Sequence, residues 1–167
     1  ALIVPMSLDE KIEFFKCLQY FFEKQWFSLK KYANESGIKI IGDIPIYVSY
    51  DSADVWCNPK QFDLNKDLIP NVVAGCPPDK FSKKGQLWGN PLYRWDYHRQ
   101  TNYYWWIERL HYCFHLYDVL RIDHFRGFDE YDSIPYKDKT AVNGQWEQGP
   151  GMDLFREVEK ALGKKGV

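Results

Sequence analysis

The sequence predicts an α/β fold in which amphipathic helices alternate with short, buried parallel strands. Apolar residues recur at helical spacing in three separate segments, and a short apolar run bounded by turn residues follows each of the first two. Long stretches rich in Pro, Gly, Asn and Asp follow each strand, and loops of this length inside a domain are usually functional. The predicted order is helix, strand, long loop, helix, strand, loop, helix.

The first predicted helix covers residues 8 to 34. Ser7 and Glu10 have the spacing of a capping box, in which each side chain accepts a hydrogen bond from the other residue's backbone N–H. The apolar residues at helical spacing are Leu8, Ile12, Phe15, Leu18, Phe22, Trp26 and Leu29. The turn-forming run from Asn34 to Gly37 ends the helix.

The segment 38–44 (IKIIGDI) is typical of a buried parallel strand, and Pro45 ends it. Residues 45–100 follow without sustained periodicity. Thr101 or Asn102 is expected to cap the second helix. Its apolar side is formed by Tyr103, Trp106, Ile107, Leu110, Phe114 and Tyr117.

The second predicted strand covers residues 119–123 (VLRID), and a further irregular segment follows it. The third helix is expected over residues 153–162, closed by Gly163.

Length and charge exclude several classes of protein. The 167 residues suffice for one domain with a core but are few for a closed eight-stranded barrel. Lys and Arg number 22 against 23 Asp and Glu, and the charges are interspersed, so neither nucleic acid nor an anionic membrane is an expected partner. No apolar run could cross a bilayer and residues 1–6 lack a secretion-signal layout, so we expect a soluble, cytoplasmic protein.

The cysteines and histidines suggest no metal or disulfide. The four cysteines are far apart in the sequence and are expected to be reduced thiols that pack in the core as small hydrophobic residues: Cys17, Cys57, Cys76 and Cys113. His111 and His115 are four residues apart, a spacing that can bind a metal, but no third ligand is nearby and ordinary helix-face histidines are favoured. No cofactor is expected.

Aromatic residues make up 18% of the chain. Aromatic rings with polar edges hold flat, partly apolar ligands, although they also fill cores. Together with a net charge of −1, this favours a neutral ligand such as a sugar over single-stranded nucleic acid.

Arg121 and Asp123 are two residues apart on the second strand and therefore point to the same side, while Leu120 and Ile122 point to the other. A nearby guanidinium favours the charged form of a carboxylate. An ionised Asp123 at a strand's carboxyl end suits a nucleophile and not a general acid. A plain buried ion pair is the structural alternative.

The segment 121–128 (RIDHFRGF) resembles the nucleophile strand of the 4-α-glucanotransferase (amylomaltase) family of the α-amylase clan. Further segments match this family in the same order: GDIPIYV at 42–48, DSADVW at 51–56, PPD at 77–79, FS at 81–82, GQLWGNPLY at 85–93, YWW at 104–106 and GPG at 149–151. The resemblance implies part of a (β/α)8 TIM barrel, namely about two β-α units with long loops. Residues 1–167 would be a single, incomplete segment of the catalytic domain.

The resemblance also implies roles for individual residues. Asp123 would be the nucleophile of a retaining double displacement on 1,4-α-glucans, and Arg121 would keep it ionised. His124 would hydrogen-bond sugar hydroxyls. Asp43 would lie near the sugar, with a turn role beside Pro45 as the alternative.

A loop that closes over the glucan would carry Asp79, Phe81 and Trp88, although Trp88 could instead serve only to pack the loop. Such a lid would exclude water so that a sugar hydroxyl resolves the intermediate. Lys80 stands where this family usually has an aromatic residue.

The motif that carries the family's general acid, similar to AEDLG, does not occur in these residues, and neither Glu147 nor Glu157 has suitable neighbours. We therefore expect the isolated segment to be inactive. The alternatives are a hydrolase of the same clan and a non-catalytic glucan-binding piece. The expected partners are α-1,4-glucans as donors and glucose as an acceptor; the sequence does not predict an oligomeric state.

Overall fold

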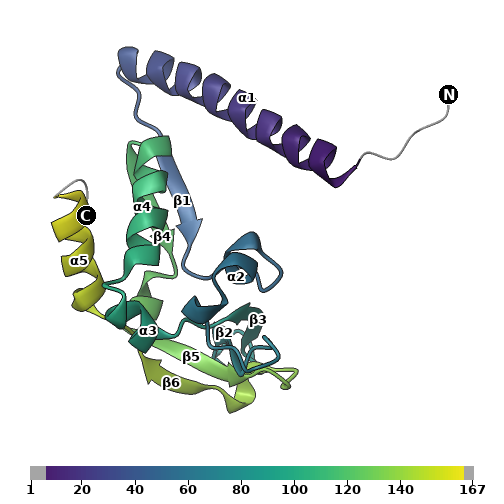
Figure 1. Ribbon diagram of the computed structural model, residues 1–167. Coiled ribbons are helices and arrows are strands. Elements are labelled where there is room, and N and C mark those ends of the chain that lie inside the picture. The colour runs from purple at the N-terminus through teal and green to yellow at the C-terminus, as the bar shows by residue number, and fades with distance from the viewer. Residues whose placement is uncertain (1–6, 164–167) are drawn as a thin grey trace.

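The computed structural model describes residues 7–163, which form two β-sheets and several helices (Figure 1). The elements are α1 (Leu8–Glu35), β1 (Ile41–Pro45), α2 (Ala53–Cys57), η1 (Pro59–Gln61), β2 (Val72–Cys76), β3 (Gln86–Pro91), α3 (Trp95–Gln100), α4 (Tyr104–Leu116), β4 (Val119–Asp123), η2 (Phe125–Phe128), β5 (Glu130–Pro135), η3 (Ala141–Asn143), β6 (Gln145–Gln148) and α5 (Met152–Leu162). β1 pairs with β4 in parallel, and the order β3-β2-β5-β6 forms a separate antiparallel sheet.

The predicted first helix is confirmed as α1, with both hydrogen bonds of the capping box. The Glu10 N–H donates to Ser7 Oγ at 3.2 Å and the Ser7 N–H to Glu10 Oε2 at 2.7 Å. None of its residues is buried, and in Figure 1 the helix extends away from the rest of the described chain. Its apolar stripe is therefore formed as predicted, but within residues 7–163 only Trp26 of the stripe is partly covered.

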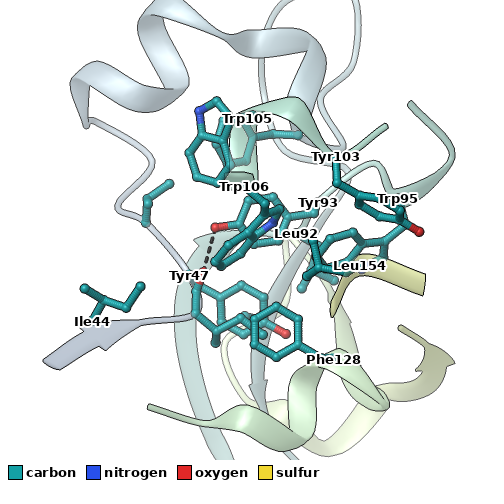
Figure 2. Packing of buried hydrophobic residues seen from close by; sticks show 14 of the residues in the cluster. Ile44, Tyr47, Leu92, Tyr93, Trp95, Tyr103, Trp105, Trp106, Phe128 and Leu154 are labelled. Carbon is teal, nitrogen blue, oxygen red and sulfur yellow. Dashed lines mark hydrogen bonds between the residues drawn. The ribbon is translucent and has the colours of Figure 1, made fainter. Parts of the chain in front are cut away.

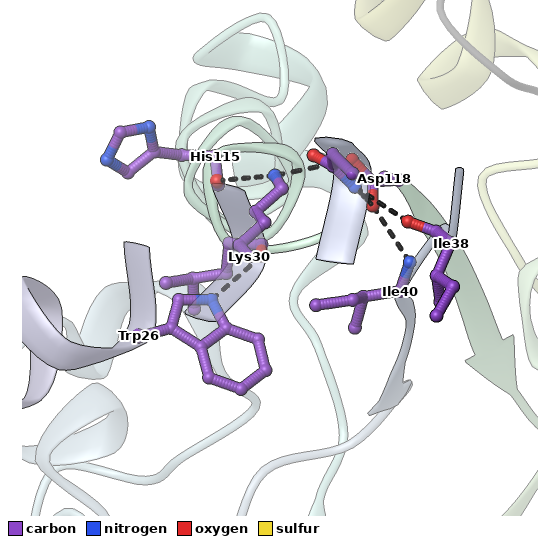
Figure 3. Close-up of polar contacts among 8 residues, drawn as sticks. Trp26, Lys30, Ile38, Ile40, His115 and Asp118 are labelled. Atoms are coloured by element: carbon purple, nitrogen blue, oxygen red, sulfur yellow. Dashed lines mark hydrogen bonds and ion pairs between the residues drawn. The ribbon is translucent and has the colours of Figure 1, made fainter. Parts of the chain in front are cut away.

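The C-terminal part of α1 contacts the end of α4 (Figure 3). The Trp26 indole N–H donates to the carbonyl of Leu116 at 2.9 Å, and the Lys30 ammonium donates to the carbonyl of His115 at 3.0 Å. These carbonyls belong to the last turn of α4, where backbone acceptors lack helical partners. α1 thus supplies the missing donors.

Asp118 joins the same helix end to the first strand (Figure 3). Its carboxylate accepts hydrogen bonds from the Ile40 N–H and from the Asn34 amide, both at 2.8 Å, and lies 3.7 Å from Lys30 Nζ. The backbone hydrogen bond from Ile40 and then the one from Asn34 lower the pKa of Asp118. The start of β4 is therefore fixed against the start of β1.

The two parallel strands agree with the prediction in order and direction, and the bounds of β4 are those expected. β1 begins at Ile41 instead of residue 38. Both were expected to be buried, which is wrong, because residues alternate between the two faces and one face is exposed in the described chain. The covered face lies so close to the residue that follows α4 that a Cβ at Gly42 would come within 2.1 Å of the Tyr117 ring.

The antiparallel sheet was not predicted, since residues 45–100 and 124–150 were expected to be irregular. β2, β3, β5 and β6 contain four to six residues each, too few for a visible alternation. β2 pairs centrally with β5, so that Val73 faces Ile134 across the sheet. A pairing between segments so far apart in the chain leaves no local signal.

The start of α4 also differs from the prediction. Thr101 does not cap it: its hydroxyl donates back to the carbonyls of Tyr97 and His98 at 3.1 Å, closing α3. α4 begins after Tyr103, which has a left-handed backbone with φ of 54° and caps no backbone N–H with its side chain. The apolar face of α4 is confirmed, and Trp105 and Trp106 are both buried.

The core is largely aromatic and fixes the chain just after β1 (Figure 2). Tyr93, stacked among tryptophan and tyrosine rings, donates its hydroxyl to the carbonyl of Ile46 at 2.6 Å. Arg109 lies over the Trp106 ring at 4.9 Å and donates to the carbonyls of Ile46 and Pro45 at 3.1 and 2.7 Å. These bonds satisfy backbone acceptors where β1 ends.

All four cysteines are free thiols, as predicted, but only two are shielded from solvent. Cys113 is buried and Cys76 half-buried, whereas Cys17 and Cys57 are exposed. The expectation of four buried cysteines is therefore wrong. No helix between residues 7 and 163 has the length and apolarity that a membrane span requires.

Asp132 on β5 is a buried carboxylate with only 2% of its surface exposed. Neither of its side-chain oxygens has a hydrogen-bond partner among residues 7–163. The loop that covers it approaches closely, because a Cβ at Gly144 would lie 2.2 Å from Asp132 Oδ1. Desolvation raises the pKa of Asp132, since burial penalises its charged form.

We expect Asp132→Asn to stabilise the protein at neutral pH. The folded-state pKa of Asp132 is raised, so its ionisation destabilises the folded protein. This destabilisation is absent below the unfolded-state pKa of about 3.9 and develops as pH rises through the folded-state pKa. The variant should therefore unfold with a free energy higher by roughly 1 kcal/mol at pH 7 and show little gain near pH 4. Thermal unfolding across this pH range measures the difference, with exposed Asp67→Asn as the control. An equal gain at both pH values would contradict this interpretation.

Candidate active site

The candidate active site lies at the carboxyl ends of β1 and β4. In the parallel register Asp43 is the partner of Arg121, and Pro45 is the partner of Asp123. Alternation along the strands places Asp43, Arg121 and Asp123 on the face that α4 does not cover. Three charged side chains from two strands therefore meet at one edge of the sheet.

Arg121 bridges the two carboxylates. Its Nη1 donates to Asp43 Oδ2, and its Nη2 donates to Asp123 Oδ1 at 2.8 Å. The planar guanidinium offers separate, fixed donors, so each carboxylate is held in a defined position. The prediction that Arg121 and Asp123 share a side is confirmed.

The ion-pair group is accessible to solvent. The side chains of Arg121 and Asp123 are each 61% exposed, so this ion pair is not buried within the described chain. The group carries one positive and two negative charges. A carboxylate with a free oxygen and a fixed orientation can approach an electrophilic carbon.

His124 directly follows Asp123 and turns the chain sharply, with a left-handed φ of 53°. Its half-buried ring meets Trp88 of β3 edge to face, with centroids 4.7 Å apart. Burial lowers the pKa of His124, while the neighbouring Asp123 opposes this shift by favouring the imidazolium. The antiparallel sheet therefore reaches the end of β4 through this pair.

Trp88 is fixed on both sides. Its indole N–H donates to Gln86 Oε1 at 3.1 Å, and its ring contacts Tyr47 with centroids 6.3 Å apart. Part of the ring remains open to solvent. A ring held in place with one open face is suited to stacking on a flat apolar surface.

Asp79 and Phe81 lie in the loop between β2 and β3, and the structure does not bring them to the ion-pair group. Asp79 Oδ1 accepts hydrogen bonds from the backbone N–H groups of Phe81 and Ser82 at 2.8 and 2.7 Å, which holds the turn. Phe81 is 86% exposed, and Lys80 Nζ lies 4.9 Å from its ring centroid. Of the predicted site residues, Asp43, Arg121, Asp123, His124 and Trp88 therefore come together, and these two do not.

Tyr47 is a site residue that the sequence interpretation did not single out. Its buried ring contacts both Trp88 and His124 at 6.3 Å, and desolvation raises its pKa. It follows β1 within the GDIPIYV segment, where the strand has ended and periodicity no longer tells which way a side chain points. The matching motif was the one available signal.

No group of three or more potential metal-ligating residues exists between residues 7 and 163. His115 packs its ring on Phe27 with centroids 4.4 Å apart, and His111 is exposed on the same helix.

The comparisons with known proteins identify one family. A family model described as 4-alpha-glucanotransferase matches residues 4–167. The 4-alpha-glucanotransferase of Clostridium butyricum is 55% identical over 94% of this chain, and the chloroplastic/amyloplastic enzyme of Solanum tuberosum is 47% identical over 98%. The amylomaltase of Streptococcus agalactiae, solved in complex with acarbose, matches 94% of the chain with a TM-score of 0.91 and 51% identity.

The chain spans only about a third of these proteins: 32% of the C. butyricum enzyme, 28% of the potato enzyme and 32% of the S. agalactiae chain. The predicted family and the assignment to part of a (β/α)8 barrel are both confirmed.

The titration of His124 tests the electrostatics of this site. We expect its pKa to lie below the usual value of about 6.5, and Asp123→Asn to lower it further, because the variant removes the carboxylate that favours the imidazolium. NMR titration of the histidine ring measures both values, with His111 in the same spectra as an exposed reference. A rise in the His124 pKa on removal of the carboxylate would contradict the geometry.

Proposed function

This chain belongs to the 4-alpha-glucanotransferase family, and we propose that it is the segment of the catalytic barrel that carries the nucleophile. The observation that carries this proposal is the Arg121 bridge between Asp43 and Asp123 at the carboxyl ends of two parallel strands. Barrel enzymes build their active sites at this end of the strands. The same-family proteins named above carry the transferase name.

In the proposed reaction, Asp123 attacks the anomeric carbon of a 1,4-α-glucan. The bond from this carbon to the bridging oxygen breaks as a covalent glucosyl ester forms, and the leaving oxygen takes a proton from a general acid. The 4-hydroxyl of an acceptor glucan or glucose then displaces the carboxylate and gives its proton to the same group, now a base. Two inversions retain the anomeric configuration.

The general acid is proposed to come from a part of the polypeptide outside these residues. A retaining mechanism needs a second carboxyl about 5–5.5 Å from the nucleophile. The two carboxylates near Arg121 both form ion pairs with it. One of them, Asp123, is the proposed nucleophile, and the other, Asp43, shares the same guanidinium, so we do not assign Asp43 as the general acid. Glu147 lies on β6 and accepts a hydrogen bond from Tyr131 at 3.1 Å, so we assign it no role in catalysis. The inactivity of the isolated segment stays a prediction.

Substrate binding is proposed for His124, Asp43 and Trp88 beside the nucleophile, and for Asp79 and Phe81 in the β2–β3 loop. The half-open Trp88 ring would stack on a sugar, and the exposed Phe81 would act if the loop closes over the glucan. Closure would exclude water and favour a sugar hydroxyl as acceptor. Asp79 would also position Phe81, because its carboxylate holds the turn by accepting a hydrogen bond from the Phe81 N–H.

A hydrolase of the same clan would share this nucleophile, and a non-catalytic glucan-binding piece would share only the binding residues. Incubating the full-length protein with maltotriose separates the three. Longer oligosaccharides indicate transfer, hydrolysis products alone indicate a hydrolase, and unchanged maltotriose indicates a binding piece. The cytoplasmic location stays a prediction, since the potato relative is named chloroplastic/amyloplastic.

We expect Asp123→Asn in the full-length protein to reduce transfer between maltotriose molecules by about 10³-fold or more, because an amide cannot act as the nucleophile. Glu147→Gln is the matched carboxylate control and should retain activity within about threefold. Product formation followed by chromatography gives both rates. Substantial activity in the Asp123 variant would exclude that residue as the nucleophile.

We expect Arg121→Lys to reduce transfer by about 10²-fold, because one ammonium on a flexible stem cannot hold two carboxylates as the guanidinium fork does. Arg99→Lys, in an exposed ion pair with Asp96, is the control. The thermal midpoints of both variants should stay close to that of the unmodified protein, since the pairs are exposed. Equal rates in the two variants would show that the bridge does not position the nucleophile.

A further inference from the structure

A second concave surface lies on the first long loop, beside α2 and apart from the ion-pair group. It encloses about 310 Å³ and is lined mainly by Tyr50, Ser52, Val55, Trp56, Leu64 and Leu68. Small-molecule sites usually enclose roughly 300–1,000 Å³, so this groove has room for a small ligand or for part of a longer one. We call it the Trp56 groove.

Trp56 is 84% exposed. Each of the six other tryptophans has a ring contact, a hydrogen bond or a cation above its ring within the described chain. The Trp56 side chain has none of these with any residue from 7 to 163, and only its backbone N–H is bonded, to the Ser52 carbonyl. An indole left open beside a groove is an apolar surface available to a ligand.

The walls of the groove are fixed before any ligand arrives. The Tyr50 hydroxyl donates to the carbonyl of Leu68 at 3.0 Å. Leu68 has a left-handed φ of 61°, and Asn65 holds its turn by accepting from the N–H groups of Asp67 and Ile69 at 2.8 and 3.1 Å. Because these walls are already ordered, less binding free energy is lost to ordering side chains and loops when a ligand binds.

The lining chemistry disfavours an anionic ligand. Among residues 7–163, Asp51 is the one charged residue that lines the groove, and no lysine or arginine does. A phosphate or another anion would therefore meet a carboxylate without a compensating cation. A ligand with an apolar ring face and hydroxyl donors fits the indole on one side and the Asp51 and Ser52 oxygens on the other.

We propose that the Trp56 groove binds a stretch of α-glucan remote from the bond that reacts. Tyr50 follows Pro45, the end of β1, by five residues, so the groove is built on the loop that leaves the same strand end as Asp43. A long donor or acceptor chain would occupy both places, and a short one only the active site. The proposal rests on the proposed function, because it takes its ligand from that reaction.

The experiment compares chain lengths in the full-length protein. Trp56→Ala should raise KM for long linear amylose about three- to tenfold and KM for maltotriose less than twofold, because only the long chain reaches the groove. Trp56→Phe should recover most of the loss. Trp146→Ala, which removes an exposed tryptophan of β6 far along the chain, should leave the amylose-to-maltotriose ratio unchanged.

Calorimetric binding of maltoheptaose in the Asp123→Asn background tests the groove independently of transfer, so it also decides the matter if the proposed function fails. Trp56→Ala should weaken this binding about three- to tenfold. Equal changes in KM for both substrates with unchanged maltoheptaose binding would overturn the proposal. A lower thermal midpoint with no change in any glucan parameter would also overturn it, since Trp56 would then be covered by another part of the polypeptide.

Discussion

The organisation of the site depends on one guanidinium placed between two parallel strands. Arg121 contacts Asp43 on β1 and Asp123 on its own strand, and the register makes Asp43 and Arg121 direct neighbours. Two carboxylates this close would repel each other without a cation, and a register shift of one residue would place Asp43 on the opposite face from Arg121 and Asp123. The ion pairs of Arg121 therefore form only in this strand register, and the close approach of the two carboxylates depends on Arg121.

The strand ends are held from the other face by the aromatic core. Arg109 and Tyr93 bond the carbonyls just after β1, and the face opposite the ion pairs packs so tightly that only glycine fits at residue 42. Asp118 fixes the start of β4 by accepting a hydrogen bond from the Ile40 N–H. The aromatic core and these hydrogen bonds therefore fix β1 and β4 in place. The ion pairs of Arg121 need not stabilise the strands, and exposed ion pairs contribute little to stability.

The sequence predicted what is local and left out what is not. The capping box of Ser7, the α4 apolar face and the bounds of β4 follow from spacing within one segment, and the structure confirms them. The shared side of Arg121 and Asp123 follows from strand periodicity in the same way. The link from Arg121 to Asp43 does not, because it depends on a register between segments 78 residues apart. The antiparallel sheet was missed for the same reason, and Tyr47 because no periodicity survives past the end of a strand.

The missed sheet links the loop that carries Phe81 to the end of β4. Its strand β3 carries Trp88, whose ring meets His124 immediately after Asp123, while the loop before β3 carries Phe81. Under the proposed function, a sugar beside Asp123 would lie next to the His124 and Trp88 pair, and Trp88 lies on the strand into which that loop leads. The left-handed turn at His124 is what brings the end of a barrel strand against a sheet of different direction. The Trp88–His124 contact therefore joins the antiparallel sheet to the end of the strand that carries Asp123.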